Sequence, residues 1–194
     1  LHLSIRRQRQ MCIRDSLAAV ELGKAMGARV VAATSSEEKS ALAVSKGADI
    51  GIVYPRGPFD KAGTKKLSGL FKEAVGPSGA NVIYDAIGGS YAEASLRCIA
   101  WEGRFLVVGF PSGIPSIPLN LTLLKGCQIA GVFWGAFTEK QPEANATNIR
   151  ELYAFFSEKK IRPHVSARYP LSHAAQAIKD LSERRAMGKI VVTI

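Results

Sequence analysis

The 194-residue sequence lacks the features of several large classes of protein. Its three cysteines, Cys12, Cys98 and Cys127, are isolated from one another and from any histidine at a ligand interval, so no disulfide framework and no metal site are expected. No apolar run approaches the roughly 20 residues that a membrane-spanning helix requires. The amino terminus also lacks the apolar core and small-residue cleavage site of a secretory signal. We therefore expect a reduced, cytoplasmic chain without a membrane partner.

Negative charge is scarce. The chain has 26 lysines and arginines against 16 aspartates and glutamates, a formal net charge of +10. Residues 1–16 hold four arginines and one aspartate, and the remaining charges are scattered singly or in pairs. A nucleic-acid surface would gather them into a stripe with interleaved aromatic residues. A solvated surface that attracts an anionic cofactor explains the charge better than nucleic acid does.

Segments with the apolar spacing of a helix alternate along the sequence with short apolar segments typical of strands. Apolar residues at helical spacing follow Leu17, and Gly27 suits the left-handed cap that ends the helix. Residues 29–34 form a β-branched apolar run with no polar alternation, which is typical of a parallel strand covered on both faces. Ser35 followed by Glu38 resembles the capping box of a second helix.

The alternation continues to the end of the chain. Further strands are expected at 49–54, 81–89, 103–110 and 128–133, and further helices at 64–76, 91–100, 120–126 and 142–159. Strands alternating with helices through short loops predict right-handed crossovers and an α/β, Rossmann-like doubly wound parallel sheet. The pattern changes to strand, helix and strand over residues 161–194, which we interpret as an appendage to another domain.

Five motifs in order point to one family. They are "ELGKAMGARVVAATSSEEKSALAVSKGAD", "VIYDAIGG", "GRFLVVGFPSG", "GVFWGAF" and "ERRAMGKIVV". Together they resemble the medium-chain dehydrogenase/reductase superfamily, in its zinc-free quinone oxidoreductase branch, the zeta-crystallin-like proteins. The resemblance implies a carboxy-terminal half of such an enzyme. Residues 17–160 would be an incomplete NADPH-binding Rossmann domain, and residues 161–194 an incomplete return to a GroES-like catalytic domain.

Residues 1–16 depart from the family's pattern. Family members carry a first strand and a glycine-rich turn, G-x-x-G-x-x-G, and counting back without gaps puts its glycines at Gln10, Ile13 and Ser16. Glycine lets the backbone approach the cofactor's pyrophosphate, so we expect the chain as written to bind NADPH poorly and to be inactive. The stretch "MCIRDS" also resembles a translated transposon-end adapter of sequencing libraries, which makes residues 1–16 a non-native segment. A natural arginine-rich leader is the alternative.

The resemblance assigns the adenosine end of the cofactor to the loop "TSSEEK". Ser35, Ser36 and Lys39 stand where NADPH-dependent relatives contact the 2′-phosphate, and no Asp or Glu ends the strand to accept from a free ribose hydroxyl. Tyr54, which ends the next strand, matches a family tyrosine beside the adenine-ribose end. A solvated helix lysine and an ordinary strand-end tyrosine are the alternatives for Lys39 and Tyr54.

The nicotinamide end falls on two later motifs. Gly109 and Phe110 of "VVGFPSG" follow a parallel strand, at the edge where open sheets bind ligands. Phe133 and Trp134 of "GVFWGAF" hold the corresponding place on the next strand, with core packing as the alternative. Asp85 of "VIYDAIGG" is interpreted as structural, accepting from loop amides.

The tail and the reaction complete the expectations. Arg185 and Lys189 resemble a basic pair that closes over the phosphate end, with plain surface charge as the alternative. The family's reaction is hydride transfer from NADPH to a quinone or another α,β-unsaturated carbonyl compound. Water can protonate the resulting oxygen, so positioning carries most of the catalysis and no catalytic residue is assigned. The resemblance implies a homodimer for the intact protein. Because some zeta-crystallin-like proteins are structural or bind RNA, a non-catalytic role stays open.

Overall fold

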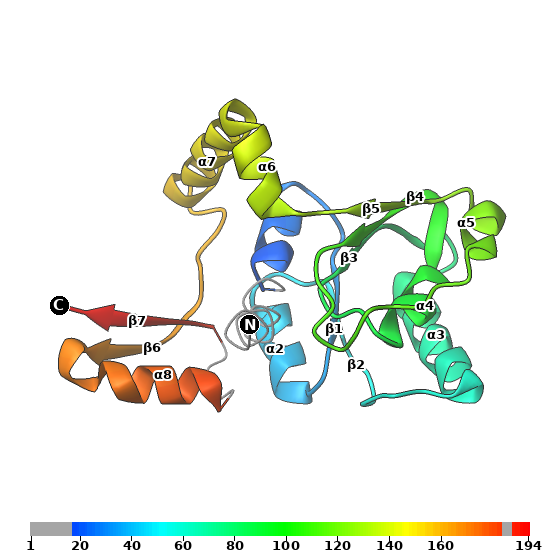
Figure 1. Cartoon of the computed structure of the whole chain (residues 1–194), viewed down its shortest axis with the longest axis horizontal. Helices are drawn as coiled ribbons and strands as arrows, with labels where there is room; N and C mark the ends of the chain where they lie inside the picture. Colours follow the sequence, from blue (N-terminus) through cyan, green and yellow to red (C-terminus); the bar gives the residue numbers. More distant parts are fainter. Residues whose placement is uncertain (1–16, 184–187) are drawn as a thin grey trace.

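The computed structural model describes residues 17–183 and 188–194 (Figure 1). The proposed non-native segment 1–16 and Arg185 lie outside the described residues. The chain alternates strand and helix as far as β5 and α7, and then forms a smaller unit of β6, α8 and β7. This order follows the one expected from the hydrophobic periods.

The bounds of the elements are as follows. The strands are β1 Val31–Thr34, β2 Ile50–Val53, β3 Ala80–Asp85, β4 Ile99–Val107, β5 Gln128–Gly131, β6 Val165–Pro170 and β7 Lys189–Thr193. The α-helices are residues 17–25, α2 Glu37–Ser45, α3 Lys61–Val75, α4 Tyr91–Leu96, α5 Asn120–Lys125, α6 Trp134–Lys140, α7 Pro142–Ser157 and α8 Ala174–Ser182.

Every strand pair in the described structure is parallel. β1 pairs with β2, β4 lies between β3 and β5, and β6 pairs with β7. The expected α/β class with a parallel Rossmann-like sheet is confirmed. Within residues 17–183, no ladder joins β1 to β3, so the main sheet consists of a β2–β1 block and a β3–β4–β5 block. In the usual strand order, the first strand stands between these two blocks.

Helix α3 shows how the sequence specifies one of these elements. Asp60 caps its first turn, because the Asp60 Oδ1 accepts from the Gly63 N–H at 2.7 Å. Leu67 and Phe71 are four residues apart and buried on one face. The helix ends at Gly76, whose φ of +84° favours glycine.

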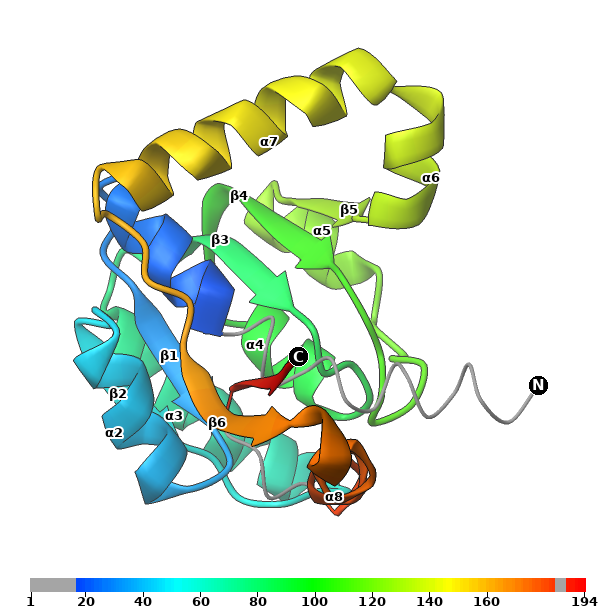
Figure 2. The same cartoon turned by 90° about the vertical axis from the view of Figure 1, so that its left-hand side faces the viewer.

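The core does not divide as the sheet does, because a cluster around Leu67 and Phe71 of α3 packs against both Ile52 of β2 and Ile83 of β3. Phe105 and Leu96 are fully buried in the cluster between β4, α4 and α5. A second cluster joins Val20 of the first helix to Ala32 of β1. Full burial of each large apolar side chain contributes about 1.5–3 kcal/mol to the free energy of folding. This packing holds the strands and helices in place, and with them the loops that follow the strands. Figure 2 shows α7 lying along the outside of this domain, beside the 17–25 helix.

Several boundaries differ from the sequence-based expectation, among them the end of β3, which is Asp85 and not residue 89. The helix expected at 91–100 ends at Leu96, because the Cys98 N–H donates to the Ser95 carbonyl and the chain enters β4 at Ile99. The apolar residues of "CIA" fit a strand as well as a helix, so periodicity alone misassigned them. Helix α6 was not expected, and β5 ends two residues earlier than 133. No helix within residues 17–183 and 188–194 is both long and apolar enough to cross a membrane.

Candidate functional site

The carboxyl ends of β1 and β2 bring together four of the expected cofactor residues. The Tyr54 N–H donates to the Thr34 carbonyl at 2.9 Å, so the two strands end side by side. Beyond β1, the Ser36 Oγ caps α2 by accepting from the Lys39 N–H at 3.4 Å. The Lys39 ammonium donates to the Ser35 Oγ at 3.1 Å. Two hydroxyls, one cation and a helix amino terminus therefore form a cluster suited to an anion.

Two acidic residues beside this cluster do not compete for it. Glu37 and Glu38 start α2, and both are exposed. Lys39 is half-buried and turned toward Ser35. This arrangement leaves a cation, rather than a carboxylate, at the end of β1.

Tyr54 belongs to an aromatic cluster at the same edge. Its ring centroid lies 5.0 Å from that of Tyr91, and the Tyr91 ring meets Phe59 edge-on at 5.2 Å. The Tyr91 hydroxyl accepts from the Gly57 N–H at 2.8 Å, which holds the loop after β2 against α4. Sequence reasoning missed Tyr91, because its only signal was its place at the start of a helix.

Asp85 organises the end of β3. Its Oδ1 accepts from the Ile87 and Gly88 N–H groups, both at 2.9 Å, which confirms the expected role with loop amides. Its Oδ2 is buried and has no hydrogen-bond partner among the residues that the structure describes. Burial raises the pKa of the Asp85 carboxyl, and the two N–H donors oppose this rise.

The loops after β3 and β4 pack backbone against backbone. The Gly109 N–H lies 3.3 Å from the Asp85 carbonyl, so Gly109 stands at the same edge as Asp85. Gly88 has a φ of +68°, and a Cβ there would lie 2.5 Å from the Phe110 Cβ. Glycine is therefore required at this contact. This contact places Phe110, which is 44% exposed, beside the carboxyl ends of β3 and β4.

The other expected residues lie further out. Phe133 and Trp134 lie where α6 begins and are 77% and 68% exposed, so core packing does not explain them. Lys189 begins β7, and its side chain is exposed. With Leu17 and Glu21 it lines a groove of about 640 Å³ between the first helix and α7. Lys189 thus stands near the start of the first helix, whereas its expected partner Arg185 lies outside the described residues.

Comparison with known proteins decides the family. The family model for zinc-binding dehydrogenases matches residues 47–192. The chain belongs to this family. Quinone oxidoreductase-like protein 2 of Rattus norvegicus is 34% identical to it over 168 residues, which is 86% of this chain and 46% of that protein. A quinone oxidoreductase of Pseudomonas aeruginosa is 29% identical over 179 residues, 91% of this chain and 52% of that protein.

Solved structures of zinc-binding dehydrogenase relatives share the fold. A mycobacterial quinone oxidoreductase superposes with a TM-score of 0.77 at 26% identity, over 90% of this chain and 51% of that one. A mycobacterial protein solved with NADPH gives 0.75 at 26% identity, over 92% of this chain and 52% of that one. The resemblance to quinone oxidoreductases of the medium-chain dehydrogenase/reductase superfamily is confirmed. The chain spans about half the length of its curated relatives, 46% of the rat protein.

The carboxyl ends of the strands offer groups that can bind and position a ligand. They present hydroxyls, a lysine and a helix amino terminus at one end, and backbone amides with aromatic side chains at the other. Within residues 17–183 and 188–194, no three His, Cys, Asp or Glu side chains gather closely enough to hold a metal ion. The arrangement suits a long ligand that has a flat ring at each end and an anionic group at one end.

Proposed function

We propose that the chain is the carboxy-terminal half of an NADPH-dependent quinone reductase-like enzyme. The intact enzyme would transfer a hydride to a quinone or another α,β-unsaturated carbonyl compound. The observation that carries this proposal is the cluster of Ser35, Ser36 and Lys39 at the start of α2, which suits a 2′-phosphate. The NADPH complex of a mycobacterial relative and the names of the rat and Pseudomonas relatives support it.

The cofactor would lie along the carboxyl edge of the strands. Ser35, Ser36 and Lys39 would hold its 2′-phosphate, and Tyr54 would lie beside the adenine. At the other end, the backbone of Gly109 and Phe110 would hold the carboxamide, with the aromatic side chains of Phe133 and Trp134 nearby. Arg185 and Lys189 would close over the phosphates from the tail. When bound, NADPH supplies the hydride, and these residues orient its ring and exclude water.

The chain as written lacks the family's glycines at the pyrophosphate position. Counting back without gaps puts them at Gln10, Ile13 and Ser16, and glycine is the residue that lets the backbone approach the pyrophosphate closely. We therefore propose that residues 1–194 alone neither bind NADPH usefully nor turn over.

Two apolar surfaces support the proposed missing partners. In the tail, Leu171 and Ile178 are 60% and 67% exposed, which favours packing of residues 161–194 on a GroES-like domain. At the edge of the sheet, every residue of β5 is exposed. A second copy of the intact enzyme would cover this surface and form the proposed homodimer.

The test is kinetic and uses a restored chain, in which the amino-terminal half of the rat relative precedes residues 17–194. We expect the restored chain to oxidise NADPH when a quinone is added, and residues 1–194 alone to show no oxidation above background. A restored chain that folds but fails to oxidise NADPH, whichever quinone or enone is added, would overturn the proposal. Salt-sensitive binding of single-stranded RNA by that inactive chain would favour the RNA-binding alternative.

A further inference from the structure

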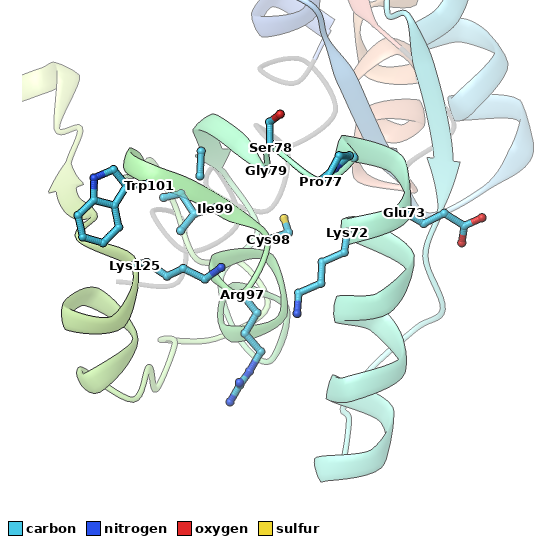
Figure 3. A pocket seen from close by; sticks show the side chains of 12 residues that line it. Lys72, Glu73, Pro77, Ser78, Gly79, Arg97, Cys98, Ile99, Trp101 and Lys125 are labelled. Carbon is cyan, nitrogen blue, oxygen red and sulfur yellow. The ribbon is translucent and has the colours of Figure 1, made fainter.

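A second cavity lies at the opposite edge of the sheet, away from the proposed cofactor site. It has a volume of about 610 Å³ and opens where α3, α4 and α5 end and β3 and β4 begin (Figure 3). This volume is in the range of small-molecule sites. We call it the basic groove, because Lys72, Arg97 and Lys125 line it around Cys98, with Trp101 to one side.

Among the described residues, two of the three cations in the basic groove have no counterion. The Arg97 guanidinium donates through Nε and Nη2 to the Glu93 Oε1, at 3.0 and 2.6 Å, so its charge is compensated. Lys72 and Lys125 both lie near enough to Cys98 to act on its thiol electrostatically. Neither lysine has a hydrogen-bond or ion-pair partner within the part of the chain that the structure describes.

The groups that line the groove do not neutralise the two lysines. Burial raises the pKa of the Cys98 thiol to about 11, so the thiol is neutral at pH 7, and its Sγ–H donates to the Ser95 carbonyl. Glu73 lines the groove, but its carboxylate points away from the three cations in Figure 3. Lysines commonly stabilise helix carboxyl ends, yet here Lys72 of α3 and Lys125 of α5 converge on one cavity from two helices.

Trp101 gives the groove an aromatic surface. Its indole is 70% exposed although it belongs to β4. The ring lies against Gly126, where an added Cβ would be only 2.9 Å from it, so the glycine allows the indole to pack closely on the backbone. An exposed aromatic ring held beside unpaired cations is a surface on which a flat anionic ligand can stack.

We propose that the basic groove binds an aromatic phosphate monoester, of which a mononucleotide is the simplest example. The phosphate lies between Lys72 and Lys125, and the aromatic ring of the ligand stacks on Trp101. The groove is at the amino ends of the strands, so this ligand is separate from the cofactor proposed for the carboxyl ends. The proposal therefore does not rest on the proposed function.

The test is a fluorescence titration of the full chain with AMP. The chain has two tryptophans, so Trp134→Phe leaves Trp101 as the single reporter. We expect saturable quenching by AMP that weakens as salt is added, because the lysines attract the phosphate. Lys72→Gln and Lys125→Gln should each weaken AMP binding about tenfold, the loss expected for one charge-assisted contact. Lys65→Gln is the matched control, because Lys65 is an exposed lysine of the same helix, and it should leave the affinity unchanged.

The competing ligands decide between this proposal and simpler ones. Quenching by adenosine at the same concentrations as AMP would show that the phosphate is not recognised and would overturn the proposal. Displacement of AMP by inorganic phosphate at equal concentration would show a plain anion site and would also overturn it. An absence of saturable quenching by AMP would overturn the proposal as well. Lys39→Ala should leave the Trp101 signal unchanged, since AMP bound at the proposed cofactor site is far from this groove.

Discussion

The ammonium group of Lys39 lies 3.1 Å from the hydroxyl of Ser35, at the first turn of α2. The contact holds the lysine near the capping hydroxyl of Ser36 and the free amides of the helix start. A phosphate placed there would meet a charge, two hydroxyls and the helix dipole together. A free ribose hydroxyl would gain little from the same groups, so the contact bears directly on the choice between NADPH and NADH.

The first prediction concerns this choice. In the restored chain, Lys39→Ala should weaken NADPH binding by roughly 1–3 kcal/mol, the loss of a charge-assisted hydrogen bond. NADH binding should barely change, because NADH has no 2′-phosphate. Calorimetric titration of each cofactor measures both values, and Lys65→Ala is the control for a change in surface charge. Equal losses for the two cofactors would show that Lys39 does not contact the 2′-phosphate.

The second prediction concerns the two loop amides that Asp85 holds. Asp85→Ala removes the acceptor for the Ile87 and Gly88 N–H groups and should cost about 1–3 kcal/mol of unfolding free energy. Asp85→Asn keeps a carbonyl oxygen in that place and should cost less. Urea unfolding of both variants measures the difference. If the two variants lose the same stability, the loop amides do not depend on this acceptor.

The third prediction is the pH dependence that Asp85 confers. The folded-state pKa of this carboxyl is raised above its ordinary value of 3.8, so the folded protein holds the proton more tightly than the unfolded chain. Its contribution to stability is therefore greatest below pH 3.8 and falls as the pH rises from there through the raised pKa. Relative to the original chain, Asp85→Asn should gain stability as the pH rises through that window. An unfolding free energy that shows the same pH slope in both proteins would contradict this account.

The fourth prediction uses two glycines of opposite character. Gly88→Ala should destabilise the chain, because the position has a φ of +68° and its new Cβ would approach Phe110 within 2.5 Å. Gly69→Ala should stabilise it by about 0.5–1 kcal/mol, because Gly69 is inside α3 and its new Cβ meets no atom within 4 Å. Thermal melts of the two variants test the pair. A Gly88→Ala variant that melts at as high a temperature as Gly69→Ala would contradict this prediction.

The sequence predicted those elements whose local pattern has one explanation. The helix expected at 64–76 is the one that the structure shows as α3, and the β-branched run at 29–34 predicted the parallel strand that the structure shows as β1. The boundary between α4 and β4 was misplaced, because "CIA" satisfies both periods and the choice depends on pairing with β3.

The candidate site was predictable only in part, and for a different reason. Ser35, Ser36 and Lys39 lie within one short loop, so a motif could find them. The Tyr91 ring contacts Tyr54 across 37 residues of chain, and Lys72 and Lys125 line one cavity although they lie further apart in the sequence. Such neighbours are created by the topology of the sheet, and no local pattern in the sequence marks them.

The most direct test of the central claim is a calorimetric titration of NADPH into the restored chain and into residues 1–194 as written. We expect the restored chain to bind NADPH more tightly than NADH. We expect residues 1–194 to give no measurable binding heat, because they have Gln10, Ile13 and Ser16 at the sequence positions of the family's glycines. Comparable NADPH affinity in the two proteins, or no NADPH binding by a folded restored chain, would contradict this claim.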